Sequence, residues 1–235
     1  MDSQTRHALK EDKFVLATQS GASWVGEHRS TVIRWTIVAA VVLLIVIVGL
    51  VVYSQRASAA ETALGAAQDL YSTPLAQPGV PAQKNSYTSA TERAKAANAQ
   101  FTQVASQYGW LPAGAKAHYF AGLSYEELGQ TASAESQLKD AAGAWDGNLS
   151  SLAKFALAGL YHQSSRDAQA IELFNGLIAK PTTSVPLYTS QLALADLYAS
   201  AGKQEQAKAL WAKVKDEDKT GSAGSIASEK LMAKK

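Results

Sequence analysis

The sequence predicts an all-α protein, with a single transmembrane helix followed by an α-solenoid of about three to four helix pairs. Three observations lead to this fold class. A pattern of small, aromatic and apolar residues recurs with a period of 36 and 37 residues. An uncharged apolar run of nineteen residues, 35–53, precedes the repeats. The prolines fall between the proposed helices, where a missing backbone donor does no harm. A fixed period of this length is typical of stacked helix pairs.

Tyr125, Tyr161 and Tyr198 mark the three copies of the pattern. In each copy a small residue precedes the tyrosine by three positions, which places both on one helix face. A second stripe follows, with a small residue, a large apolar residue four places on and another apolar residue three further. Its members are Ala134, Leu138 and Ala141; Ala170, Phe174 and Leu177; and Ala207, Trp211 and Val214. This spacing predicts a second helix with one apolar face in each copy.

The turn between the two helices of a copy is predicted at Gly129 and Gly202, because glycine adopts a left-handed backbone without steric penalty. Ser165 takes this place in the second copy. An earlier second helix is indicated by a matching stripe at Ala97, Phe101 and Val104, and 60–71 reads as its partner. The proline-containing segment 72–88 is an inserted loop between them.

The register of prolines supports this division of the chain. Pro74, Pro78 and Pro81 lie in the inserted loop, and Pro112, Pro181 and Pro186 lie at repeat junctions. An irregular alanine-rich bundle is the alternative. The predicted organisation is therefore a tail at 1–34, a transmembrane helix at 35–53, a repeat domain at 54–221 and a capping helix at 222–235.

The run from Trp35 to Tyr53 is about 28 Å long as a helix, which suffices for a hydrocarbon core of about 30 Å. A cleaved signal peptide is the alternative, since Ala57-Ser58-Ala59 resembles a cleavage site. The apolar run exceeds the usual length of such a signal, and a polar segment of 34 residues precedes it. Cations are more frequent before the run than directly after it. This bias predicts a cytoplasmic N-terminus and an exported C-terminal domain.

Composition excludes several classes of function. With 22 basic and 20 acidic residues, the chain lacks the basic patch of a nucleic-acid-binding protein. The absence of cysteine excludes disulfides and thiol nucleophiles. His118 and His162 occupy different places in their copies, which argues against paired metal ligands. We therefore expect neither catalytic residues nor a metal or cofactor. An enzyme with an unrecognised site stays open, with only His162, Glu126 and Glu127 as candidate groups.

The repeat pattern resembles the tetratricopeptide repeat over about 88–215, and more weakly at 60–71. That family has small residues where Gly122, Ala158 and Ala195 stand, and aromatics at the three tyrosines. The resemblance implies a protein-binding groove lined by the first helices. Its positions fall on Lys116, Tyr119, Leu123, Glu126 and Glu127; Leu152, Phe155, Gly159, His162 and Gln163; and Thr189, Leu192, Asp196, Ala199 and Ser200. Alternatively, these side chains pack on the preceding repeat or on 60–71.

The whole layout, with a short tail, one membrane helix and an exported repeat array, resembles the ancillary Sec-translocon subunit family of bacteria. This resemblance implies a single-pass inner-membrane scaffold with a periplasmic domain. Its implied partners are the translocon, a periplasmic chaperone or an emerging exported protein. An envelope-assembly or cell-division adaptor built from the same repeats is the alternative, and the sequence does not separate the two. The oligomeric state is likewise open.

Overall fold

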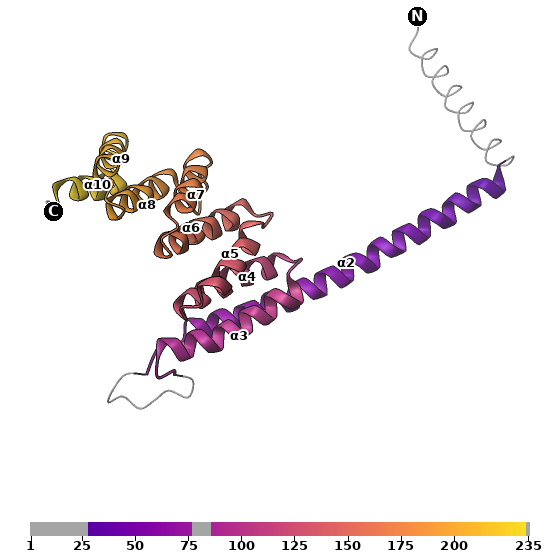
Figure 1. The fold of residues 1–235 in the computed structure, drawn as a ribbon. Helices are drawn as coiled ribbons and strands as arrows, with labels where there is room; N and C mark the ends of the chain where they lie inside the picture. Colours follow the sequence, from indigo (N-terminus) through magenta and orange to yellow (C-terminus); the bar gives the residue numbers. More distant parts are fainter. Residues whose placement is uncertain (1–27, 77–85, 234–235) are drawn as a thin grey trace, which may run out of the picture. The chain divides into compact units, whose positions relative to one another are not determined.

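The computed structural model describes residues 28–76 and 86–233, and all regular secondary structure among them is helical (Figure 1). The predicted tail lies outside the described residues as far as position 27, and the inserted loop does so at 77–85. The chain divides into two compact units, with the boundary between Gln55 and Arg56. The helices are α2 (Arg29–Tyr71), α3 (Ala90–Tyr108), α4 (Pro112–Glu127), α5 (Thr131–Ala142), α6 (Gly147–Gln163), α7 (Asp167–Ala179), α8 (Leu187–Ser200), α9 (Gln204–Glu217) and α10 (Ser222–Met232).

The described part of the first unit is the beginning of α2. Its apolar side chains are exposed, and its most apolar stretch is covered by none of the described residues. The helix is long and apolar enough to cross a membrane. The sequence suggested separate helices at 35–53 and 60–71, whereas α2 continues through both. Residues 54–59 contain neither glycine nor proline, so nothing in their chemistry interrupts the backbone hydrogen bonds.

The second unit is built from antiparallel helix pairs. We call α4, α6, α8, α10 and the last part of α2 the first helices, and α3, α5, α7 and α9 the second helices. The earliest pair joins the end of α2 to α3, where Leu64 and Phe101 are buried in one apolar cluster. Tyr71 meets the edge of the Phe101 ring at 5.9 Å between centroids. The weakly marked copy at 60–71 is therefore a first helix, as predicted.

Each second helix buries the predicted stripe. All nine stripe residues of α5, α7 and α9 are buried, with Leu138, Phe174 and Trp211 filling the space between helices. At about 25 cal/mol per Å² of apolar surface, burial of one such side chain contributes about 2 kcal/mol. The buried side chains of the stacked repeats form three successive apolar clusters along the domain.

The turns inside the pairs share one backbone geometry. Gly129 and Gly202 have φ angles of 70° and 75°, and Ser165 has 58°. In each turn the following amide donates to the carbonyl of the marker tyrosine, for example Arg166 N to Tyr161 O at 2.8 Å. Ser165 therefore adopts the left-handed conformation that its place in the repeat requires, although it is not glycine.

The loops between repeats are tight corners. A Cβ added to Gly114 would lie 2.0 Å from the Tyr108 carbonyl oxygen, so the start of α4 packs directly on the backbone at the end of α3. At the next corner, Asp146 caps α6 by accepting from Asn148 N at 2.9 Å, and Ser150 Oγ donates to Ala142 O at 2.6 Å. These contacts fix where α4 and α6 begin.

Candidate protein-binding face

Side-chain bridges connect the first helices to one another, and most of them use positions predicted to line the groove. Lys116 Nζ donates to Glu61 Oε1 at 3.2 Å, Tyr71 Oη to Glu127 Oε2 at 3.0 Å, Gln163 Nε2 to Glu126 Oε1 at 2.8 Å and Lys230 Nζ to Asp196 Oδ2 at 3.0 Å; His162 Nε2 and Ser200 Oγ lie 2.9 Å apart. We call this surface the first-helix face. It is bridged by polar groups along its length.

Glu126 and Glu127 turn toward different neighbours, as their adjacent places on one helix predict. Glu126 meets Gln163 of the next first helix, whereas Glu127 meets Tyr71 of the preceding one. Burial, together with the hydrogen bond to Glu127, raises the pKa of Tyr71 to about 12. Arg93 lies over the Tyr71 ring at 5.6 Å and pairs with Glu127 at 3.8 Å. Tyr71 therefore remains a protonated donor throughout the neutral pH range.

The apolar positions of the face are half-buried. Tyr119, Leu152 and Phe155 pack against the central apolar cluster, and Leu192 packs against the C-terminal one. Phe155 meets the edge of the Phe174 ring with 5.5 Å between centroids. Burial, and secondarily the charge of Glu126, raises the pKa of Tyr119. Packing thus accounts for the inner sides of these residues, while each keeps part of its surface accessible.

The remaining predicted positions are less involved in contacts between repeats. Leu123 and Gly159 are partly exposed on α4 and α6, and Thr189 is exposed in the first turn of α8. A Cβ at Gly159 would meet nothing within 4 Å, so this position is open on the face.

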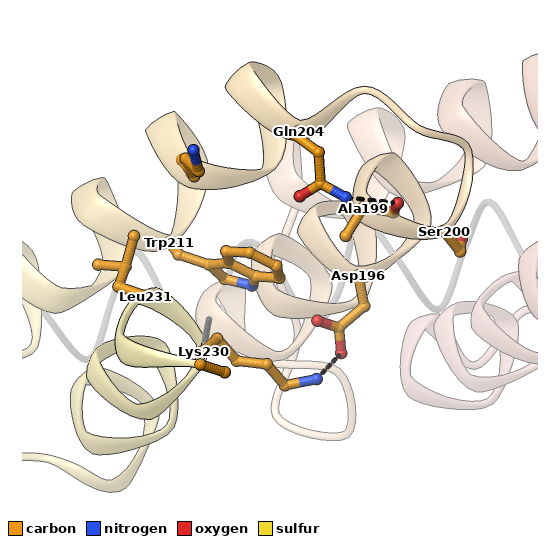
Figure 2. A pocket seen from close by; sticks show the side chains of 9 residues that line it. Asp196, Ala199, Ser200, Gln204, Trp211, Lys230 and Leu231 are labelled. Carbon is orange, nitrogen blue, oxygen red and sulfur yellow. Dashed lines mark hydrogen bonds and ion pairs between the residues drawn. The ribbon is translucent and has the colours of Figure 1, made fainter. Parts of the chain in front are cut away.

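An open pocket of about 770 Å³ lies where α8, α9 and α10 meet (Figure 2). Three of its lining residues, Asp196, Ala199 and Ser200, are predicted face positions. The others are Gln204, Lys208, Trp211, Lys230, Leu231 and Ala233. Figure 2 shows Lys230 reaching across to Asp196, and Gln204 Nε2 donating to the Ala199 carbonyl at 3.1 Å.

The sequence did not single out the α9 and α10 side of this pocket. Trp211 is 7% exposed, and its indole Nε1 has no hydrogen-bond partner in the described part of the chain. An unmet buried donor costs about 1–3 kcal/mol, so a ligand carbonyl or carboxylate that reached it would recover part of that energy. The available signal was the size of Trp211, which exceeds that of Leu138 and Phe174 at the same repeat position.

His162 lies between an acid and a hydroxyl. Its Nδ1 is 2.7 Å from Asp167 Oδ1, and its Nε2 is 2.9 Å from Ser200 Oγ. This order of groups matches a Ser-His-Asp triad, which also needs donors for an oxyanion. The backbone amides after the serine, at 201 and 202, donate instead to the carbonyls of Leu197 and Ala199. His162 of α6 thus connects to Ser200 of α8 on one side and to Asp167 of α7 on the other.

Comparison with known proteins gives one structural likeness. No family profile matches the chain, and no curated protein matches it. A crystal structure of nearly identical TPR-like repeats, from a protein described as a kinesin light chain of Podosopora anserina, is 17% identical with a TM-score of 0.54. The match covers 74% of this chain and 84% of that one. A likeness at this identity concerns the fold alone, and the chain accordingly has a tetratricopeptide-like repeat fold behind one long apolar helix.

Proposed function

We propose that this protein is a membrane-anchored scaffold that binds other proteins through its first-helix face. The observation that carries the proposal is the row of partly exposed apolar side chains on successive first helices, Tyr119, Leu123, Phe155 and Leu192. Such a row offers apolar anchors to an extended or helical segment, and the bridging polar groups around it supply hydrogen-bonding partners.

The anchor gives the scaffold its second property. The apolar part of α2 holds the repeats at a membrane, which raises their effective concentration near membrane-bound partners without any added contact. As the finer proposal, the layout of tail, anchor and exported repeats supports an accessory of the Sec translocon and periplasmic chaperones in a bacterial inner membrane. In this arrangement the N-terminus is cytoplasmic and the repeats are periplasmic.

Site-specific crosslinking in intact cells tests the proposal. A photoreactive amino acid is placed at Leu123, Phe155 or Leu192, and as matched controls at Gln169 and Lys213, which are exposed on second helices. We expect adducts with translocon subunits or chaperones from the three face positions and none from the controls.

Each other outcome has a definite meaning. Equal adducts from face and control positions, or none from either, would remove the binding role of the face. Adducts with a cell-division or envelope-assembly protein would preserve the scaffold and overturn the translocon assignment.

A further inference from the structure

Two tryptophans protrude from the repeat unit. Trp145 is fully exposed and Trp110 is 66% exposed. Tryptophan side chains are on average largely buried. Two indoles that protrude into solvent therefore point to contact with a surface outside the repeat unit. Trp110 lies in the loop between α3 and α4, and Trp145 lies in the loop between α5 and α6. Both therefore occupy loops that lead from a second helix into the next first helix.

These loops share one edge of the stack. A second helix and the first helix that follows it run antiparallel: the Phe101 and Phe120 rings of α3 and α4 stack at 5.3 Å, and Tyr161 Oη of α6 donates to Glu135 of α5 at 3.2 Å. The helices α4 and α6 therefore begin at the same edge, and the turns at Gly129 and Ser165, where they end, lie at the opposite edge. We call the former the corner edge.

The start of the second unit belongs to the corner edge as well. The bridges Glu61–Lys116 and Tyr71–Glu127 join residues 55 and 56 apart, so α2 and α4 run parallel in that register. Trp110 then lies close to the level of Arg56. The hydrogen bond between Glu126 of α4 and Gln163 of α6 joins residues 37 apart, so each position at the level of α4 corresponds to one about 37 residues later at the level of α6. In this register Trp145 lies near the level of Trp110.

Chain reach brings this edge close to the apolar run. Arg56 follows Tyr53, the last residue of that run, by three positions, and three residues span at most about 11 Å. Whatever the relative placement of the two units, the corner edge begins within that distance of the end of the membrane segment. Indole rings favour the membrane–water interface, where the ring is in an apolar layer and the N–H remains wet.

We propose that the corner edge lies against the membrane surface, with Trp110 and Trp145 in the lipid headgroup region. The inference rests on the membrane anchor of the proposed function. The corners are fixed by the close packing at Gly114 and by the Asp146 cap, so they present the indoles without ordering a flexible loop. Arg56 and Asp146 give the edge mixed charge. The contact is therefore carried by indole burial and is insensitive to salt.

Single-cysteine labelling tests this in the full chain, which contains no cysteine. A fluorophore is attached at Ala144→Cys on the corner edge, at Gln130→Cys on the opposite edge and at Val46→Cys in the apolar run. The proteins are reconstituted in vesicles of phosphatidylcholine and phosphatidylglycerol that contain nitroxide lipids as quenchers. We expect headgroup nitroxides to quench the label at 144 several-fold more than the label at 130, equally at low and high salt.

The double variant Trp110→Ala/Trp145→Ala should abolish the difference between positions 144 and 130, while circular dichroism shows an intact fold. Unquenched Val46→Cys with acyl-chain nitroxides would refute the anchor itself. A quenched position 46 with equal quenching at 144 and 130 would refute only the corner-edge contact. Quenching at 144 that survives the double variant would refute the role of the indoles in binding lipid. Quenching at 144 that appears only when another protein is added would refute it as well.

Discussion

The turn at Ser165 gives the sharpest test of the repeat geometry. Ser165 holds a φ of 58° at the place where the other two turns have glycine. A left-handed backbone raises the free energy of the folded state by about 1–2 kcal/mol for an L-residue. Glycine avoids this strain but loses about 0.5–1 kcal/mol more backbone entropy on folding, which offsets part of the gain. Ser165→Gly should therefore stabilise the protein by about 0.5–1 kcal/mol. For a domain of this size that corresponds to a rise in Tm of about 1–4 °C.

Gly202→Ser provides the matched control. A Cβ at Gly202 would meet nothing within 4 Å, so this substitution introduces backbone strain without a clash. It should lower Tm by about as much as Ser165→Gly raises it. Both are measured by thermal unfolding of the full chain in detergent, followed by circular dichroism. If Ser165→Gly lowered Tm or left it unchanged while Gly202→Ser was neutral, the reasoning from backbone strain would be wrong.

Three further outcomes are expected. Gly114→Ala should destabilise the fold by about 2–3 kcal/mol in denaturant titrations, because its Cβ would overlap backbone, whereas Gly159→Ala, with open space around it, should stabilise by up to about 1 kcal/mol; equal effects would contradict the tight corner. Bonds from Arg166 and Lys139 lower the pKa of Glu135 from 4.5 to about 2, so Glu135→Gln should cost about 1 kcal/mol at pH 7. The difference in unfolding free energy between the variant and the unsubstituted protein should shrink as pH falls from 4.5 toward 2, because Arg166 and Lys139 stabilise only the ionised Glu135 carboxylate. A difference that does not change with pH would refute the ion pairing of Glu135. Neither the unsubstituted protein nor Ser200→Ala should hydrolyse p-nitrophenyl acetate above the buffer rate, and hydrolysis lost in the variant would show that the His162 bridge is catalytic.

The repeat architecture could be predicted because its determinants are local. A small residue and a large one at helical spacing report the buried face directly, and all nine stripe residues are buried as expected. Turn geometry also follows from sequence, since the register places Ser165 where the backbone must be left-handed. The continuity of α2 was visible only as the absence of a helix breaker at 54–59, which is a weaker signal than a breaker that is present.

The candidate site was less predictable because its contacts depend on how separate helices align. The bridge between Glu126 and Gln163 joins residues 37 apart, and its existence depends on the rotamers of both side chains. The pocket near Trp211 depends on the length of α10, which ends at Met232. Asp196 lines this pocket, but the predicted positions do not show which neighbour fills or leaves open the adjoining space.

The bridges on the first-helix face have a mechanical consequence. Each joins exposed or partly exposed polar groups, and such contacts contribute at most about 1 kcal/mol apiece. The same first helices also share buried apolar side chains, among them Leu157, Leu160 and Leu194 in the central cluster, and these contacts resist separation. The bridges therefore align neighbouring first helices more than they hold them together. Raised ionic strength should weaken only the two ion pairs, Lys116–Glu61 and Lys230–Asp196, and leave the stack of repeats intact.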